Sequence, residues 1–481
     1  MAERDTVMLD TATAARLRAW AGGWPELAAV RAWRPAMPVH LVGGVVRDLL
    51  LGRDPKDVDL VLPDSVPALA RRLAGRLGGA RVPLHDDPPT ERIALAGGRS
   101  LDLAAYRGPD LRADLRARDF TVNALALDLA ALLGTGPLAL IDPTGGWADL
   151  GRGLVRIAGP TALHADPLRL LRAYRLLATL PPPLGGGHWR LTAATAAQIR
   201  HRRRTLRQPA RERVAAELLL IFASPRAWTV VRAMVRAGLL APALPPLSAG
   251  TPKTSARVPR PPITPALRSY GTTALGWLGR ARRDLAGIVG PARAGWLAAA
   301  LAEELSAGRP RVALLGWLAL TLETAAARQL NPAATLALVG AVADALRASR
   351  REQQEARAIA RALLGPDLLA PPATLAAERD RREALAALGE AAPGALLLAW
   401  ARARGRPTAA LCAELDRYWQ VIAPLLAAPP LVDGTTLMAA LGLPPGPALG
   451  RVLATLRTAR LRGEIATAAE ALALAKQVRV P

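Results

Sequence analysis

The sequence predicts an α/β domain over its first third, followed by an all-α remainder. Strand-like segments concentrate before residue 160, whereas from residue 166 onward apolar residues recur with helical spacing almost everywhere. The composition agrees, because the chain is rich in Ala, Leu and Arg but has only 2 Phe and 4 Tyr, a balance that favours helices. Since 481 residues exceed what one hydrophobic core serves, we expect about two to four domains.

The strands predicted in the first third are short apolar runs bounded by Gly, Pro or Asp. A helical pattern at 66–78 falls between them, and strands alternating with helices indicate a layered α/β domain. In chain order, the predicted strands are VHLVGG at 39–44, DVDLVL at 57–62, ERIAL at 91–95, SLDLAAY at 100–106 and LVRIAG at 154–159.

The helical remainder is predicted to begin at 166–180, with Asp166 as the N-cap and Pro167 at the first helical position. The Pro- and Gly-rich segment 181–187 ends this helix. A stretch at 240–267 is rich in Pro, Ser and Thr and has the composition of a linker, so we place a domain boundary there. We find no internal repeat of fixed period.

The charge balance indicates a polyanionic partner such as nucleic acid. The chain has 63 Lys and Arg against 39 Asp and Glu, which gives a net charge of +24 and a pI near 11.5. Almost all of the positive charge is Arg, and an excess of Arg and Ala also follows from a GC-rich genome. The charge therefore supports nucleic-acid binding but does not by itself identify the partner.

Cysteine content and the N-terminus predict a cytoplasmic protein. A single cysteine, Cys412, excludes an internal disulfide and a multi-cysteine zinc site, and it fits a reducing compartment. The first ten residues lack the basic and then apolar order of a signal peptide, and no uninterrupted apolar run of about 18 residues occurs. We expect no membrane partner, and the sequence does not indicate the oligomeric state.

The first block with recognisable chemistry is LVGGVVRDLLLGRDPKDVDLVLPD at 41–64. A predicted strand ends at Gly43 and Gly44 and passes into a short helix that carries Arg47, an arrangement whose backbone N–H groups suit a triphosphate. An ordinary glycine turn explains Gly43 and Gly44 equally well when they are taken alone.

Three carboxylates interrupt predicted apolar strands. Asp57 and Asp59 are two positions apart on one strand, so their side chains share a face and can hold a pair of divalent cations. Asp102 interrupts the strand SLDLAAY in the same way. An unpaired carboxylate in such a strand is costly, which favours a metal site; a salt bridge to an arginine is the alternative for Asp102.

Two later blocks carry arginines. In RARDFTVNALALDL at 116–129, Arg118, Asp119, Thr121 and Asn123 precede a segment that we interpret as an apolar helix, which Asp119 or Thr121 can cap. In HADPLRLLRAYR at 164–175, Arg169, Arg172 and Arg175 recur at three-residue spacing along one side of a helix. This spacing is typical of a solvated face or of contacts to RNA phosphates.

Taken in order, GGVVRDLLLG, DVD, the Asp102 strand, RDFTVNALA, DPTGGWADL and DPLRLLRAYR resemble the class II tRNA nucleotidyltransferase and bacterial poly(A) polymerase family. The resemblance spans about residues 38–222. It implies an α/β polymerase-β-like nucleotidyltransferase head domain followed by all-α neck, body and tail domains. On this basis we expect a head at 1–160, a helical neck or RNA-binding domain at 161–240, a Pro-rich linker at 241–267 and a helical body and tail at 268–481.

The resemblance also implies roles for individual residues. Mg²⁺ would bind Asp57 and Asp59, and Asp102 would be the third catalytic carboxylate. A tRNA or another RNA 3′ end would be the partner, with CTP and ATP as substrates. An Asp and an Arg that read the base edge in the family correspond to Asp166 and Arg169. The remaining nucleotide contacts would come from Gly43, Gly44, Arg47, Arg118, Arg172 and Arg175.

Three departures from the family pattern leave the product open. Ala165 stands where the family usually has Glu, and the segment 106–117 is shorter than the flexible loop of many relatives, as in enzymes that add only CC. The last histidine is His201, so the C-terminal half lacks the ligands of an HD phosphohydrolase domain. CCA addition is the leading hypothesis; CC addition, A addition and poly(A) synthesis are alternatives, as is a non-catalytic RNA-binding protein.

Overall fold

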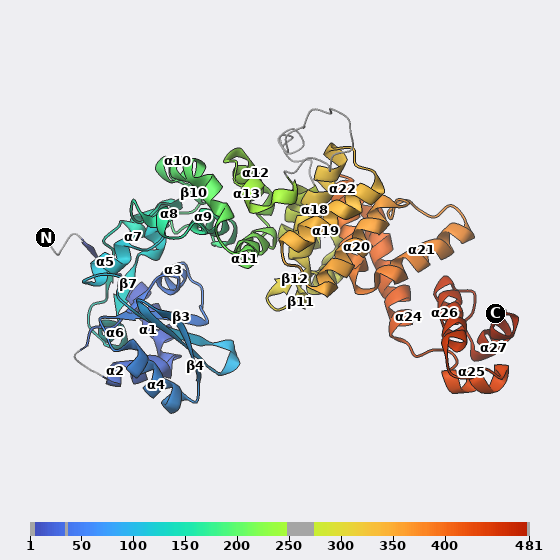
Figure 1. Ribbon diagram of the computed structural model, residues 1–481, viewed down its shortest axis with the longest axis horizontal. Helices are drawn as coiled ribbons and strands as arrows, with labels where there is room; N and C mark the ends of the chain where they lie inside the picture. Colours follow the sequence, from blue (N-terminus) through green and yellow to red (C-terminus); the bar gives the residue numbers. More distant parts are fainter. Residues whose placement is uncertain (1–4, 34–36, 248–273, 479–481) are drawn as a thin grey trace. The chain divides into compact units, whose positions relative to one another are not determined.

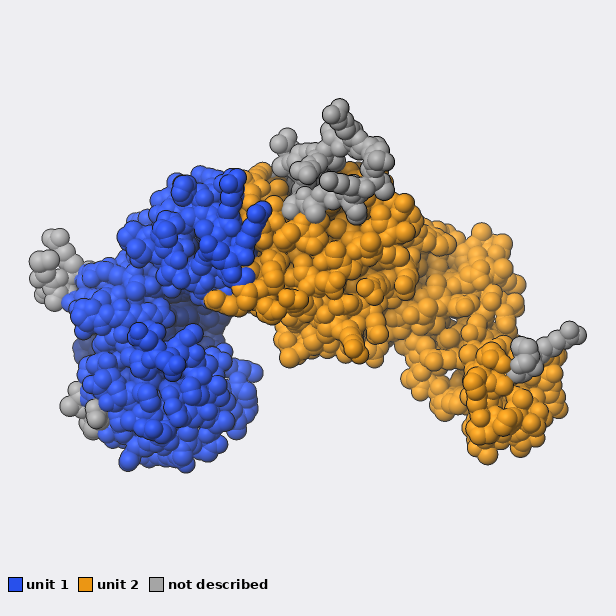
Figure 2. All heavy atoms as spheres, in the orientation of Figure 1, with its two compact units in different colours: residues 1–209 blue, residues 210–481 orange. Residues whose placement is uncertain are grey.

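The computed structural model describes residues 5–33, 37–247 and 274–478. The chain divides into two compact units, Met1–Pro209 and Ala210–Pro481, shown in different colours in Figure 2. The first unit contains the mixed sheet and the second is largely helical, so the predicted α/β domain followed by a helical remainder is confirmed. The finer division into four parts stays a prediction, and residues 248–267 of the predicted linker lie outside the described residues.

An eight-stranded mixed sheet organises the first unit, with strand order β1-β8-β7-β2-β3-β6-β5-β4. The central pair, β3 with β6, is parallel, and the other neighbouring pairs are antiparallel. The strands are β1 (Thr6–Met8), β2 (His40–Val42), β3 (Asp57–Leu62), β4 (Ala80–Asp86), β5 (Pro89–Ala94), β6 (Ser100–Ala105), β7 (Ala126–Asp128) and β8 (Ala139–Ile141).

The two faces of the sheet differ in burial because side chains alternate along each strand. On one face, Val58, Leu60, Leu101 and Leu103 are almost fully buried, and α4 (Val66–Leu77) packs on β5 and β6 (Figure 1). The opposite face carries Asp57, Asp59 and Asp102 at one end. Its other end is closed by a small apolar cluster of Val42, Val61, Leu111, Leu115, Ala124 and Ala126.

The helices of the first unit frame this sheet. The segment 66–78 is a helix as predicted, and the segment 106–117, which we expected to be a short loop, contains α5 (Leu111–Arg116), capped by the Asp110 side chain. The others are α1 (Thr11–Gly22), α2 (Pro25–Trp33), α3 (Gly44–Leu50), α6 (Leu129–Leu133), α7 (Gly146–Arg152), α8 (Ala162–Ala165), α9 (Arg169–Thr179) and α10 (Ala193–Arg202).

Two sequence interpretations of this unit were wrong. The apolar run after Asn123 is not one helix: it follows a 3-10 turn at Thr121–Asn123 and forms the strand β7 and the short helix α6. The run is too short for its periodicity to separate a buried strand from a helix. The segment 154–159 forms β9 (Leu154–Val155), which pairs with β10 (Arg190–Leu191) outside the main sheet, and an isolated bridge from Ile157 to Phe120. The strands β1, β4, β7 and β8 were not predicted.

The second unit is built around α18 (Arg311–Ala327), which is buried on nearly all sides. It packs against α11 (Arg211–Phe222), α15 (Ala274–Arg283), α17 (Pro291–Ala302), α19 (Pro332–Ala345), α20 (Arg350–Leu364) and α22 (Ala392–Arg402). A two-stranded hairpin, β11 (Glu304–Ser306) with β12 (Arg309–Pro310), interrupts the helical pattern. The other helices are α12 (Ala227–Arg236), α13 (Leu240–Ala243), α16 (Leu285–Val289), α21 (Leu375–Leu388), α23 (Thr408–Arg417) and α24 (Ala423–Ala427).

The last helices have an apolar core of their own. They are α25 (Gly434–Leu441), α26 (Pro447–Arg462) and α27 (Ala468–Gln477), and they enclose Leu437, Val452 and Ala471. One stretch in the described residues, Leu375–Arg402, is long and apolar enough to cross a membrane by length and composition. It contains α21 and α22, and 72% of its apolar window is buried inside the protein, as expected of a core helix.

Candidate active site

The three predicted carboxylates lie on two adjacent strands. Asp59 on β3 is the register partner of Asp102 on β6, and Asp57 is the partner of Ser100, whose hydroxyl donates a 2.7 Å hydrogen bond to the Asp57 carboxylate. Burial and the neighbouring charge of Asp102 raise the pKa of Asp59 to about 6. The pKa shift reflects a partly buried carboxylate held close to like charge, and a cation would relieve that repulsion.

Asp102 has a partner that the sequence analysis did not single out. Arg92 on β5 donates from Nε and Nη2 to the two Asp102 carboxylate oxygens, each at 2.7 Å. The salt bridge considered for Asp102 is therefore present, on the same face as Asp57 and Asp59.

A glycine turn brings the chain close to these carboxylates. Gly43 precedes α3 with φ 81° and ψ −140°, a conformation that essentially only glycine adopts. A Cβ atom at Gly43 would lie 2.9 Å from Arg118 Nη1 and 3.6 Å from Asp59 Oδ2. A glycine is thus required by both the backbone conformation and the close approach of two side chains, which an ordinary turn does not explain.

Arg118 is held from behind by a buried carboxylate. Its Nε and Nη2 donate to Asp114 Oδ2 at 3.0 and 2.9 Å, and Asp114 is 1% exposed. With Nε and Nη2 held by Asp114, Nη1 is directed toward Gly43. Arg118 thereby brings the block at 116–129 next to the face that carries the carboxylates.

A chain of hydrogen bonds connects three of the sequence motifs. Arg47 Nη1 donates to Asn123 Oδ1, and Asn123 Nδ2 donates to Asp119 Oδ1 at 2.9 Å. Arg172 Nη1 on α9 donates to the other Asp119 oxygen at 3.2 Å. Burial acts to raise the pKa of Asp119, but Arg172 and the Asn123 hydrogen bond outweigh it, so the pKa is lowered. Asp119 is therefore a buried anionic link, not the helix cap that we considered.

The block at 164–175 differs from its predicted form. Helix α9 begins at Arg169, and Asp166 lies in the preceding turn, where its carboxylate accepts a 3.0 Å hydrogen bond from the Leu168 N–H. Arg169 is only 9% exposed, and its Nη1 donates to the Ala162 carbonyl at 2.9 Å, so it is not part of a solvated face. Burial lowers the Arg169 pKa, and its Nε has no hydrogen-bond partner among the described residues.

Comparisons with known proteins agree with this arrangement. Residues 39–156 match the family model of the poly A polymerase head domain, and residues 190–250 match the model of a probable RNA and SrmB-binding site of polymerase A. An A-adding tRNA nucleotidyltransferase of Deinococcus radiodurans is 34% identical over 462 residues, 92% of this chain and 97% of that protein. The chain belongs to the tRNA nucleotidyltransferase family.

Other nucleotidyltransferases match to different extents. A CC-adding tRNA nucleotidyltransferase of Thermus thermophilus is 32% identical, over 90% of this chain and 92% of that protein. A CC-adding tRNA nucleotidyltransferase of Geobacter sulfurreducens is 38% identical, but the match covers 45% of this chain and only 47% of that protein. The family resemblance inferred from the motifs is confirmed, and the chain is an enzyme of the nucleotidyltransferase class.

Solved structures show that the fold of this nucleotidyltransferase extends over nearly the whole chain. A CCA-adding enzyme in an apo form has a TM-score of 0.63 and 20% identity, covering 98% of this chain and 97% of that one. A Thermotoga maritima CCA-adding enzyme complexed with tRNA has a TM-score of 0.57 at 20% identity, covering 97% of this chain and 95% of that one.

Asp57 and Asp59 of the nucleotidyltransferase have the chemistry of Mg²⁺ ligands. In nucleotide-transferring sites Mg²⁺ keeps several waters and is held by one or two carboxylates together with the substrate phosphates. Asp57 and Asp59 supply two such carboxylates from one strand face. Across the described ranges, no group of three or more His, Cys, Asp or Glu is placed to hold a metal ion. Two carboxylates on one strand face fit a cation whose other ligands are waters and substrate phosphates.

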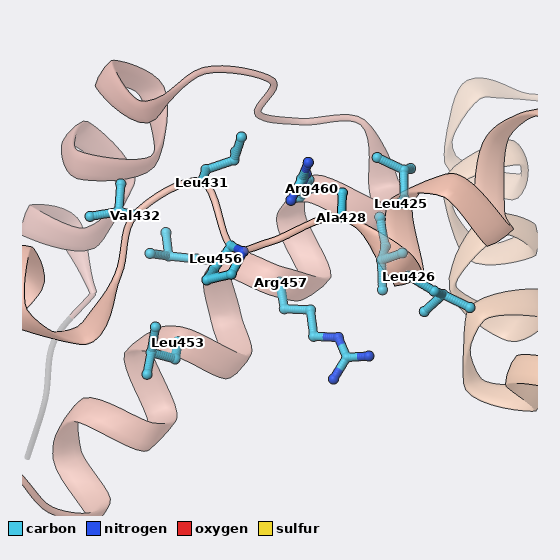
Figure 3. A pocket seen from close by; sticks show the side chains of 11 residues that line it. Leu425, Leu426, Ala428, Leu431, Val432, Leu453, Leu456, Arg457 and Arg460 are labelled. Atoms are coloured by element: carbon cyan, nitrogen blue, oxygen red, sulfur yellow. The ribbon is translucent and has the colours of Figure 1, made fainter.

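A pocket of about 340 Å³ lies elsewhere, in the second unit. Its walls come from the segment around α24 and from α26, and Figure 3 shows leucine side chains together with Arg457 and Arg460. None of the predicted site residues lines it. The candidate active site is the face of the first unit's sheet where Asp57, Asp59 and Asp102 lie together.

Proposed function

We propose that this enzyme adds all or part of the sequence CCA to the 3′ end of tRNA, using CTP and ATP with Mg²⁺. The observation that carries the proposal is the row of carboxylates on β3 and β6 beside a glycine turn, where a Cβ atom at Gly43 would meet both Asp59 and Arg118. Whole-length similarity to A-adding and CC-adding tRNA nucleotidyltransferases supports the substrate, as does the net charge of +24.

The chemistry assigned to the carboxylate face is metal-assisted nucleotidyl transfer. Bound Mg²⁺ ions would lower the pKa of the RNA 3′-hydroxyl and stabilise the leaving pyrophosphate during in-line attack on the α-phosphorus. Asp57 and Asp59 are the proposed metal ligands, and Asp102 is the proposed third carboxylate. The 3′-oxygen forms the new bond to phosphorus as the bond to pyrophosphate breaks, so the enzyme needs no covalent intermediate.

The arginines are proposed to bind the nucleotide. Arg118 lies against the Gly43–Gly44 turn, where a triphosphate would bind, and its Nη1 is directed to the carboxylate face. Arg47 and Arg172 are joined through Asn123 and Asp119, so the two guanidinium groups are positioned before a nucleotide binds. Arg175, one turn further along α9, is the last residue proposed for this group.

Base selection is assigned to Asp166 and Arg169. Choosing a base without a nucleic-acid template requires donors and acceptors fixed in the protein, and an Asp beside an Arg supplies both. Arg169 is anchored by the Ala162 carbonyl, and its buried Nε is a donor without a partner among the described residues. A buried donor of this kind favours an acceptor brought by a ligand.

Partial addition is the second candidate, because the segment 106–117 is short and contains α5, whose Leu111 and Leu115 are buried in the apolar cluster at the other end of the carboxylate face. The two whole-length relatives described above are named for CC addition and A addition. A segment anchored by apolar side chains does not rearrange freely around a second kind of base.

Incorporation of labelled CTP and ATP into tRNA tests the proposal. Three tRNAs that end at the discriminator base, at C and at CC are each incubated with Mg²⁺ and CTP, ATP or both. Completion of CCA on all three supports the full activity, a stop at CC supports CC addition, and a single A added only to the CC end supports A addition. No incorporation into any of the three by the folded protein would refute the proposed function.

A further inference from the structure

Arg92 and two carboxylates form one row across three neighbouring strands. Asp59 on β3 is the register partner of Asp102 on β6, and Asp102 is the register partner of Arg92 on β5. Adjacent strands lie about 4.8 Å apart, and register partners point to the same face. Asp102 therefore stands between a carboxylate on one side and a guanidinium on the other.

The pairing with Arg92 uses both oxygens of Asp102. Nε and Nη2 of the guanidinium approach Oδ1 and Oδ2 at 2.7 Å each, the parallel two-bond geometry that makes arginine pairs strong. The Arg92 side chain is 43% exposed, whereas the Asp102 side chain is 16% exposed. The Arg92 guanidinium can therefore turn into water more readily than the Asp102 carboxylate.

We propose that Arg92 is a positioning residue that latches Asp102 in the metal-free enzyme. The latch keeps the third carboxylate from a divalent cation until the nucleotide arrives. A triphosphate offers the released guanidinium another anion, since planar arginine donors match phosphate as well as carboxylate. This inference rests on the proposed metal site, and it makes recruitment of Asp102 depend on the nucleotide.

In the competing arrangement, Arg92 stays paired with Asp102 and orients it as a metal ligand. Removing Arg92 would then change the metal affinity in the opposite direction. Where a carboxylate ligand is held by an outer partner, removing that partner usually weakens metal binding by about 10- to 100-fold. Removing a latch strengthens metal binding, because a competitor for Asp102 is lost. The direction of the change in metal affinity therefore separates the two arrangements.

The test is Mn²⁺ binding to the full-length protein without nucleotide, followed by the electron paramagnetic resonance signal of free Mn²⁺. Arg92→Met is expected to bind Mn²⁺ about two- to fivefold more tightly than the wild type, the range for loss of a partly exposed charged pair. Arg71→Met, an exposed arginine on α4, removes the same charge and should leave the affinity unchanged. Weaker binding by Arg92→Met, or an equal gain in Arg71→Met, overturns the latch.

A second comparison uses lysine variants, which keep the positive charge but lose the guanidinium that forms two parallel hydrogen bonds. Arg81 makes a similar two-bond pair with Glu91 in the same β4–β5 hairpin. Glu91 is next to Arg92 on β5, so the Arg81–Glu91 pair lies on the opposite face of the sheet. Arg92→Lys should bind Mn²⁺ more tightly than Arg81→Lys, which should match the wild type. Equal affinities of the two lysine variants overturn the latch. Circular dichroism melting confirms that each variant is folded, and Arg92→Lys carries the test where Arg92→Met does not fold.

The background variant Asp102→Asn identifies the group through which Arg92 acts. Adding Arg92→Met to Asp102→Asn should change Mn²⁺ affinity by less than about 1.5-fold, because the competition is gone. A full gain in this background would mean that the charge of Arg92 acts at long range, and it overturns the latch. Failure of the proposed metal site is recognised separately: Asp57→Ala and Asp59→Ala would then bind Mn²⁺ as the wild type does.

Discussion

Replacing Gly43 with alanine tests whether the glycine turn is built for the site. Gly43 has φ 81° and ψ −140°, and a residue with a side chain pays about 1–3 kcal/mol to adopt such a conformation. The new Cβ would also lie 2.9 Å from Arg118 Nη1. Arg118 is tied to the buried Asp114 by two bonds, so moving it disturbs a charge-assisted interaction of about 1.5–3 kcal/mol.

The two effects together predict a loss of about 2.5–6 kcal/mol in the free energy of unfolding of the first unit. They also predict that kcat/KM for nucleotide addition falls by about 10²-fold or more, because each 1.4 kcal/mol lost at the transition state is tenfold in rate. The assay is single-nucleotide incorporation into tRNA under kcat/KM conditions, with unfolding followed by urea titration.

Gly52→Ala is the matched control. Gly52 follows the same helix α3 with φ 77°, but nothing lies within 4 Å of the position of its Cβ. This variant should lose about 1–2 kcal/mol of stability through backbone strain alone and retain its activity. If Gly43→Ala kept the wild-type kcat/KM and lost no more stability than Gly52→Ala, the close approach to Arg118 would have no role.

Three further predictions concern the carboxylates, base choice and the helical unit. Asp57→Ala and Asp59→Ala should abolish nucleotide addition but leave tRNA affinity in a filter-binding assay within about threefold, since metals serve chemistry and arginines serve affinity; near-normal addition by both variants would refute the metal assignment. Arg169→Ala should change the ratio of CTP to ATP incorporated; an unchanged ratio with lower activity would remove Arg169 from base selection. Burial raises the pKa of Glu323 from 4.5 to about 7, so the folded protein binds this proton more tightly than the unfolded chain. The contribution of Glu323 to the free energy of unfolding is therefore fully present below pH 4.5 and is lost as the pH rises through 7. Glu323→Gln should therefore be more stable than the wild type by about 3 kcal/mol at pH 8 and equal at pH 4 by chemical denaturation, and an identical pH dependence of both proteins would contradict this.

The sequence was most informative where a residue pattern is repeated locally. Asp57 and Asp59 could be placed on one face because side chains alternate along any strand, and Asp102 was noticed because it interrupts another apolar strand. The helix at 66–78 and the long helical remainder followed from apolar spacing in the same way. The order of the motifs identified the family, which the comparisons confirmed.

The sequence was least informative where several elements pack together. The run after Asn123 is buried on both faces of β7, so its apolar residues carry no strand period and were taken for a helix. The strand β4 was missed because all of its residues are exposed, which removes the alternation that marks a half-buried strand. Its position is set by pairing with β5.

Sequence alone therefore determined the family, the fold class and the carboxylates, because these follow from motif order and from the fixed period of a strand or helix. Only the tertiary structure decided the partners of those residues. Arg92 meets Asp102 through the register of a hairpin, and Arg169 is buried against Ala162 although its spacing suggested a solvated face. Register and burial depend on which surfaces pack together, and neither is a property of any short segment.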